Sequence, residues 1–126
     1  MKYAKGDELQ ERLIEFAVRI LALADKLPDT PAGRHIRGQI IKSGTSPAPN
    51  YSESRGAESN ADFIHKLKIV IKELNETLVW LIIIERSKMM KQELLKNLID
   101  ENEQLCKIIS SSIATAKKKE IKQISK

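Results

Sequence analysis

Asp62 and His65 are the residues best suited to bind a metal ion, because a spacing of three places both side chains on one face of a helix. Helical bundles hold paired iron with repeated Glu-x-x-His motifs of this spacing. The sequence contains one such pair and only two histidines, and its remaining carboxylates do not repeat the motif. We therefore expect a solvated polar face here, with no metal ion and no cofactor.

Candidate nucleophiles lack the neighbours that would activate them. Cys106 lies one position beyond an apolar row and is typical of a small core or boundary residue. The serines of Ser110–Ser112 have no candidate base nearby in the sequence, and Ser43–Ser46 is too short for a phosphate-binding loop. The carboxylates of Glu73 and Glu76 are more typical of surface ion pairs than of acid–base catalysis. The sequence thus predicts a protein that is not an enzyme.

The basic residues are the main indication of a binding function. Acidic and basic residues balance over residues 1–85, so the whole net charge of +5 falls on residues 86–126. No aromatic residues are interleaved with these cations, which favours contact with phosphates over stacking on bases. The alternative is that a lysine-rich last turn complements the helix dipole and keeps the protein soluble. The candidate nucleic-acid-binding residues form two groups: Arg86, Lys88 and Lys91, and Lys117, Lys118, Lys119 and Lys122.

The sequence predicts four helices, at about residues 7–27, 31–46, 59–86 and 91–119. Three of these ranges contain no Gly or Pro, whereas 31–46 contains three Gly and is the weakest by helix propensity. Asp7, Thr30 and Ser59 are the candidate N-terminal caps of the first three. Pro47 and Pro49 should end or kink the second helix, and residues 50–58 should form a polar link, with recovery of a helical turn as the alternative. No segment alternates as a strand does. The fold class predicted is therefore all-α: residues 1–126 form a single antiparallel, up-and-down four-helix bundle.

Apolar residues at alternating spacings of three and four mark the side of each helix that faces the core. The set expected to be buried is Leu9, Leu13, Phe16, Ile20, Leu23 and Leu27, widened by Ile14, Ala17, Leu21 and Ala24, then Phe63, Leu67, Val70, Leu74, Leu78 and Leu81, then Leu94, Leu98, Leu105, Ile109 and Ala116, a row that the polar Ser112 also interrupts. Asn102 interrupts the last row. It either fixes the register of the bundle or lies at the solvent edge. Thr77 falls on the inner face of its helix, where its hydroxyl can bond to a carbonyl of the preceding turn.

Residues 78–84 are apolar almost all round the helix, which requires more than one neighbour. In so small a protein a second subunit can supply that neighbour. The candidate oligomer interface is Trp80, Ile82, Ile83 and Ile84. Trp80 is either such an interface residue or part of the core.

The same apolar run is far shorter than the roughly 20 residues that a membrane-spanning helix needs. The residues at the beginning of the sequence lack the apolar stretch of a signal peptide. A single cysteine fits a reducing compartment. A cytoplasmic protein without membrane partners is expected.

A resemblance to a known family lies in residues 41–80, which read IKSGTSPAPNYSESRGAESNADFIHKLKIVIKELNETLVW. This stretch is similar to the bacterial four-helix bundle proteins, also called 23S rRNA intervening-sequence proteins. The matching elements are Ser43-Gly44-Thr45-Ser46, Asn50-Tyr51, the run from Ala61 to Val70, Glu76-Thr77-Leu78 and Trp80-Leu81. The sequence departs from the family pattern at Pro47-Ala48-Pro49 and in the acidic residues Glu53 and Glu58.

The resemblance implies an antiparallel four-helix bundle that assembles as a homopentameric ring and has no catalytic residues. A related protein, the accessory variability determinant of diversity-generating retroelements, binds reverse transcriptase and RNA. Our first hypothesis is accordingly a non-enzymatic homo-oligomer that binds RNA or a ribonucleoprotein through its basic surface. The alternative is a structural or adaptor protein with a protein partner and no nucleic acid. A third hypothesis, an enzyme that uses the polar link 50–58, has the least support.

Overall fold

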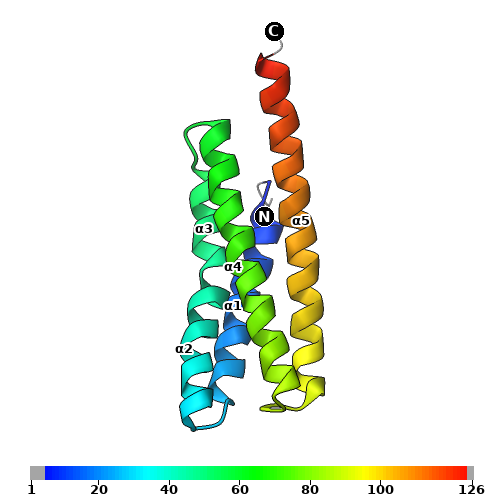
Figure 1. Cartoon of the computed structure of the whole chain (residues 1–126). Coiled ribbons are helices and arrows are strands. Elements are labelled where there is room, and N and C mark those ends of the chain that lie inside the picture. Colours follow the sequence, from blue (N-terminus) through cyan, green and yellow to red (C-terminus); the bar gives the residue numbers. More distant parts are fainter. Residues whose placement is uncertain (1–4, 125–126) are drawn as a thin grey trace.

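The computed structural model describes residues 5–124, apart from the side chain of residue 123. Within that range the chain forms α1 (Asp7–Asp25), α2 (Pro31–Thr45), α3 (Pro47–Arg55), α4 (Asn60–Arg86) and α5 (Gln92–Ile124), and contains no strand. Helices α2 and α3 follow one another along a single arm, so the molecule has four antiparallel arms (Figure 1). The prediction of an all-α four-helix bundle is confirmed. None of these helices carries an apolar stretch long enough to cross a bilayer.

Local hydrogen bonds begin two of the helices where the sequence predicts. The hydroxyl of Thr30 accepts a hydrogen bond from the Gly33 amide at 3.0 Å, and the hydroxyl of Ser59 accepts one from the Asp62 amide at 3.0 Å. Each satisfies an amide that has no partner within its own helix. These side chains therefore define the starts of α2 and α4.

The start of α1 differs from the prediction. Gly6 occupies the cap position with φ of 95°, and Asp7 is the first residue of the helix. Glycine is favoured there because other residues rarely adopt this positive φ, and a Cβ atom at this position would also lie 2.8 Å from the Tyr51 hydroxyl oxygen. The Asp7 carboxylate instead forms an ion pair with Arg55 at 2.6 Å, which ties the start of α1 to the end of α3.

The predicted polar link is mostly helical, which corrects the sequence analysis. Ser46 keeps helical dihedral angles (φ −71°, ψ −37°), and α3 begins directly after it at Pro47. Proline at a first helical position loses no hydrogen bond, because the first amides of a helix have no internal acceptor. The Asn50 side-chain amide also donates to the Ser46 carbonyl oxygen at 2.9 Å, which supports the first turn of α3.

The core is aliphatic around Phe16, and most of the predicted rows are buried. On α5, however, Leu94 is exposed and Leu95 is fully buried. The row of α5 from Leu98 to Ile109 has spacings of four, three and four. If the alternation continues toward the start of the helix, the next residue lies three positions before Leu98 and is Leu95, whereas a spacing of four gives Leu94. The alternating pattern keeps a row facing its partner helix, so it decides which leucine is buried.

Polar side chains form a layer inside the bundle. Asn102 is fully buried and donates its side-chain amide to the Leu74 carbonyl oxygen at 3.1 Å. Thr77 is also buried, and its hydroxyl donates to the Glu73 carbonyl oxygen at 2.8 Å and lies 2.9 Å from the Ser43 hydroxyl. The prediction for Thr77 is confirmed. For Asn102 the burial decides in favour of a residue that joins α4 to α5 at one register.

Candidate nucleic-acid and self-association surfaces

The first basic cluster consists of Arg86, Lys88 and Lys91 and surrounds the turn between α4 and α5. All three side chains are exposed. Lys88 has a φ of 58°, the left-handed conformation that reverses the chain between the two helices. The turn between α4 and α5 lies at one end of the bundle (Figure 1), so the three exposed cations lie at that end.

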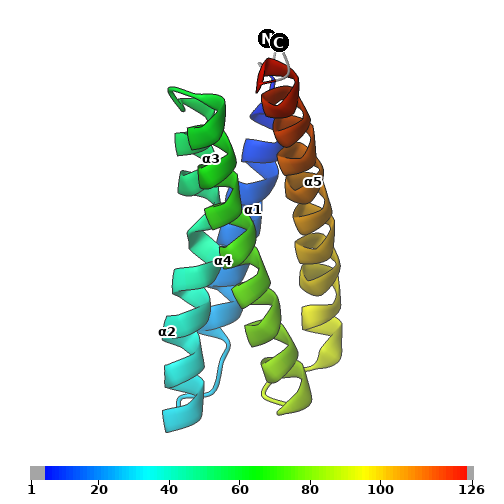
Figure 2. The same ribbon diagram turned by 45° about the horizontal axis from the view of Figure 1, so that its top comes forward.

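The second basic cluster consists of Lys117, Lys118, Lys119 and Lys122 on the last turns of α5, and all four are exposed. Helix α5 continues to Ile124, beyond the predicted end at residue 119. Its last turns extend past the start of α4 in both views of the molecule (Figures 1 and 2). The second cluster therefore lies at the opposite end of the bundle from the first.

The ion pairs of the described residues lie outside these clusters. They join Arg12 to Glu101, Arg34 to Asp29, Arg55 to Asp7 and Lys66 to Glu53. The seven clustered cations make no ion pair within residues 5–124, so they remain available to an external anion.

The predicted oligomer interface is only partly available at the surface. Ile83 is 38% exposed, while Trp80 and Ile82 are half-buried. The prediction for Ile84 is wrong, because its side chain is fully buried in the subunit's own core. Residues three or four apart lie on the same side of a helix. Ile84 follows the buried Leu81 by three positions, so it faces the core. Val79 precedes the exposed Ile83 by four positions, so it lies on the outer face.

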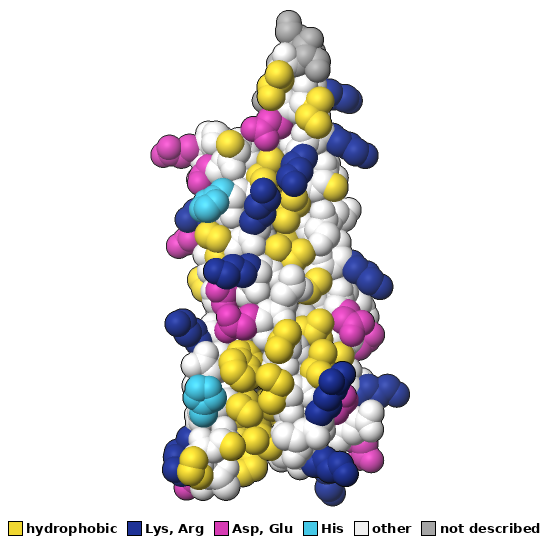
Figure 3. All heavy atoms as spheres, viewed as in Figure 1, with side chains coloured by type: hydrophobic (Ala, Val, Ile, Leu, Met, Phe, Trp, Pro, Cys, Tyr) yellow, Lys and Arg dark blue, Asp and Glu magenta, His cyan; other side chains and the backbone are white. Residues whose placement is uncertain are grey.

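Val79 is 55% exposed and was missed by the sequence analysis. With Ile83 it forms what we call the α4 face. Hydrophobic side chains gather over the lower part of the surface that α4 and α5 present, with cations on either side (Figure 3). Trp80 borders this face. Its indole ring meets the His35 ring edge-on at 6.1 Å, and its ring nitrogen lies 3.4 Å from the Glu76 carboxylate.

A second uncovered apolar row lies on α1. Ile14, Val18 and Leu21 are between 42% and 52% exposed. The sequence analysis placed Ile14 and Leu21 beside the buried row, which the structure corrects: both point outward. We call these three residues the α1 face. Their spacing of four and three indicated a common side of the helix, but not whether a neighbour covers it.

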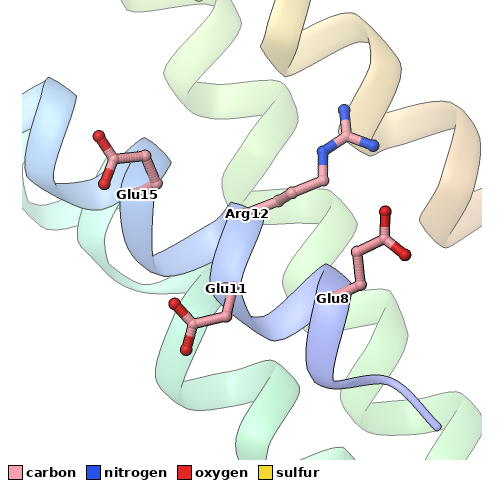
Figure 4. Close-up of a pocket in the computed structure, with 4 residues that line it drawn as sticks. All are labelled: Glu8, Glu11, Arg12 and Glu15. Atoms are coloured by element: carbon pink, nitrogen blue, oxygen red, sulfur yellow. The ribbon is translucent and has the colours of Figure 1, made fainter. Parts of the chain in front are cut away.

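The hollow of largest volume among those described, about 470 Å³, is lined by Glu8, Glu11, Arg12 and Glu15 of α1 (Figure 4). Arg12 reaches toward α5, where it forms an ion pair with Glu101 at 2.6 Å, while Glu11 and Glu15 point away from α5. The hydrogen bond to Glu101 raises the pKa of Arg12 and outweighs the opposite effect of burial. The described residues that line the hollow all come from α1, and Arg12 among them is paired with Glu101 of α5.

Other candidate chemical groups remain dispersed. Residues 5–124 contain no group of three or more His, Cys, Asp or Glu side chains placed to hold a metal ion. Burial raises the pKa of the Cys106 thiol, with a smaller contribution from Glu103, so the thiolate is disfavoured at neutral pH. In the segment predicted to be a polar link, residues 50–58, Glu53 forms an ion pair with Lys66. The side-chain amide of Asn50 forms hydrogen bonds with Ser46.

Comparisons with known proteins agree with the fold and with the resemblance in residues 41–80. A family model described as 23S rRNA-intervening sequence protein matches residues 7–111. The chain is also similar to a solved structure from Bacteroides thetaiotaomicron, a protein of unknown function from the S23 ribosomal protein family. The two are 36% identical with a TM-score of 0.78, over 82% of this chain and 96% of that one. No curated protein matches, and neither description names an enzymatic activity. The chain belongs to the 23S rRNA-intervening sequence protein family.

Proposed function

We propose that this chain is a non-enzymatic, self-associating helical bundle of the cytoplasm that binds RNA or a ribonucleoprotein through its two basic clusters. The observation that carries the proposal is the set of seven exposed cations without an ion pair in residues 5–124, gathered at the two ends of the bundle. The family's description, which names 23S rRNA, supports a ribonucleic acid as the partner.

The composition of the clusters indicates what kind of contact they make. Lysine presents a compact charge that binds phosphate oxygens, and no aromatic side chain stands among Lys117, Lys118, Lys119 and Lys122 to stack on bases. Such contacts position a nucleic acid by its backbone and carry little sequence information. Binding should therefore depend on salt and on RNA shape more than on base sequence.

Self-association would multiply these weak contacts. In a cyclic assembly, which we propose to be a pentamer, each basic cluster is repeated around the axis at its own end. Linked copies then bind one RNA with an affinity well above that of a single cluster. The uncovered apolar residues Val79, Ile83 and Val18 support such an assembly.

Fluorescence anisotropy of a labelled structured RNA, titrated with protein at rising salt, tests the proposal. Log affinity should fall linearly with log salt concentration. Changing Lys117, Lys118 and Lys119 to Gln should weaken binding and reduce the slope by up to about one for each phosphate that the variant no longer binds. The matched control changes Lys42, Lys96 and Lys107 to Gln, which are exposed, lie outside both clusters and remove the same charge.

Equal loss of affinity in the variant and the control would mean that only net charge matters. Absence of binding at low salt would overturn the nucleic-acid proposal. It would favour the second candidate, an adaptor for a protein partner, which the exposed apolar row of α1 supports. Binding of such a partner through apolar side chains should change little with salt.

A further inference from the structure

A hollow of about 330 Å³ lies at the end of the bundle where α4 starts (Figure 1). The residues that line it include Asn60 and Phe63 of the first turn of α4, Ala116 and Lys119 of α5, and Lys5 before α1. The two helices are joined here by a hydrogen bond of 2.8 Å, which the Asn60 side-chain amide donates to the Ala116 carbonyl oxygen. The hollow thus combines side chains from three segments that lie far apart in the sequence.

The charge of this hollow is positive. Lys5 and Lys119 are exposed, and neither makes an ion pair within residues 5–124. No Asp or Glu stands among the described residues that line it, and the carboxylates nearest in sequence, Asp62 and Glu120, are not among them. Asn60 is the first residue of α4, and the free amides at the start of a helix carry partial positive charge. An anion is therefore the ligand whose charge matches the hollow.

Two hydroxyl groups that line the hollow have no hydrogen-bond partner within residues 5–124. They belong to Ser111 and Thr115, which are exposed and lie about one helical turn apart on α5. The hydroxyl of Ser112, in contrast, donates to the Ile108 carbonyl oxygen at 3.1 Å. A hydroxyl group donates one hydrogen bond and also accepts. These two side chains therefore suit a ligand that carries its own hydroxyl groups beside the negative charge, as a ribose phosphate does.

Phe63 adds aromatic surface beside the two cations. Its side chain is half-buried against the core and also lines the hollow. No aromatic residue stands among the lysines of the second basic cluster in the sequence, but the fold brings Phe63 of α4 to the same hollow as Lys119 of α5. Aromatic side chains stack on the bases of single-stranded nucleic acids with little preference between bases. The hollow thus has a group suited to each part of a nucleotide.

From these features we infer that the hollow binds one unpaired nucleotide of RNA. Lys5 and Lys119 bind its phosphate, and its base lies against Phe63. The hydroxyls of Ser111 and Thr115 meet its ribose. Ligand pockets usually measure about 300–1,000 Å³, so this volume suits a single nucleotide. A base inside a duplex is already paired and stacked, so the nucleotide must come from a loop, a bulge or an end. The inference rests on the proposed RNA binding and names the part of the RNA that this end of the bundle selects.

Fluorescence anisotropy of the full chain with two labelled RNAs at one salt concentration tests the inference. One RNA is a fully paired duplex, and the other is the same duplex with a single bulged uridine. The bulged RNA should bind at least about fivefold more tightly, the usual gain from stacking one base on an aromatic side chain. Phe63→Leu keeps the apolar volume and should remove this preference, whereas Phe63→Tyr keeps an aromatic ring and should retain it.

A second pair of variants tests the phosphate contact without changing the core. Lys5→Gln with Lys119→Gln should reduce the preference for the bulged RNA. The matched control, Lys117→Gln with Lys118→Gln, removes the same charge from exposed positions that are not among the described residues of the hollow. It should weaken binding of both RNAs by the same factor and leave the preference intact.

Uridine monophosphate, added as a competitor, separates an RNA site from a site for free nucleotides. It should displace the bulged RNA only weakly, because it lacks the contacts of the duplex with the rest of the basic cluster. Complete displacement at micromolar concentration would overturn the assignment to RNA. Equal affinity for the two RNAs, or a preference that survives both Phe63→Leu and the change of Lys5 and Lys119, would overturn the inference alone. Absence of binding to either RNA would overturn the proposed nucleic-acid function as well.

Discussion

At the scale of single residues, Asn102 shows how a polar side chain can be tolerated inside an aliphatic bundle. Its amide is fully buried but donates to the Leu74 carbonyl oxygen at 3.1 Å, and its carbonyl oxygen lies 3.5 Å from the Cys106 sulfur. A buried polar group that is hydrogen-bonded costs little, whereas an unpaired one is expensive. The contact also exists only at one register of α4 against α5, so it disfavours shifted packings.

Asn102→Ala should lower the free energy of unfolding by about 1–3 kcal/mol, because it removes a buried hydrogen bond and leaves a void. The matched control is Asn97→Ala, an exposed position on the same helix that should change stability by no more than about 0.5 kcal/mol. Urea denaturation followed by circular dichroism measures both. Equal effects at the two positions would mean that the buried amide has no special role.

At the scale of helices, the division between core and outer face decides what each apolar residue of α4 does. Leu74 is fully buried among the other arms, while Ile83 is 38% exposed on the outer row. Substitution of an aliphatic residue therefore has different consequences at these two positions of one helix, although the sequence presents both as parts of apolar rows.

Leu74→Ala should reduce stability by about 2–5 kcal/mol, the usual loss for a buried leucine. Ile83→Asp should leave the melting of an isolated subunit nearly unchanged but raise the concentration needed for assembly, because it places a charge on a surface that becomes dry. Thermal denaturation and sedimentation velocity separate the two effects. If both changes act on stability in the same way, Ile83 belongs to the core after all.

The positions of the helices were largely predictable, because the signals that start and end a helix are local in the sequence. The burial of individual apolar side chains was less predictable. The caps Thr30 and Ser59 need only their own first turn, and they were found. Helix α3 was missed because Pro47 was interpreted as an end, although it also suits the start of a new helix. Ile14 and Ile84 were assigned to the wrong faces because both lie in helices with apolar residues on several sides. Which side is covered depends on how the other arms are placed, and no local pattern contains that.

At the scale of the whole molecule, the basic clusters lie at the two ends, while the α1 and α4 faces lie along the sides. The last turns of α5 carry apolar surface as well, because Ile121 and Ile124 are 63% and 80% exposed. In the proposed assembly, sideways contact through the α1 and α4 faces would leave both ends free for RNA. Changes to the lysines of the basic clusters should therefore preserve assembly, and a variant at Ile83 should weaken RNA binding only through the loss of linked copies.

The place of Trp80 makes the protein its own spectroscopic probe. It is the only tryptophan in the chain, and it borders the α4 face, half-buried against His35. Packing of a second copy there would remove the indole from water and shift its emission to shorter wavelengths, while unfolding would expose it and shift emission the other way. Dilution and denaturant titrations of the unlabelled protein should consequently give shifts that can be told apart, so dissociation and unfolding can be followed without adding a fluorophore.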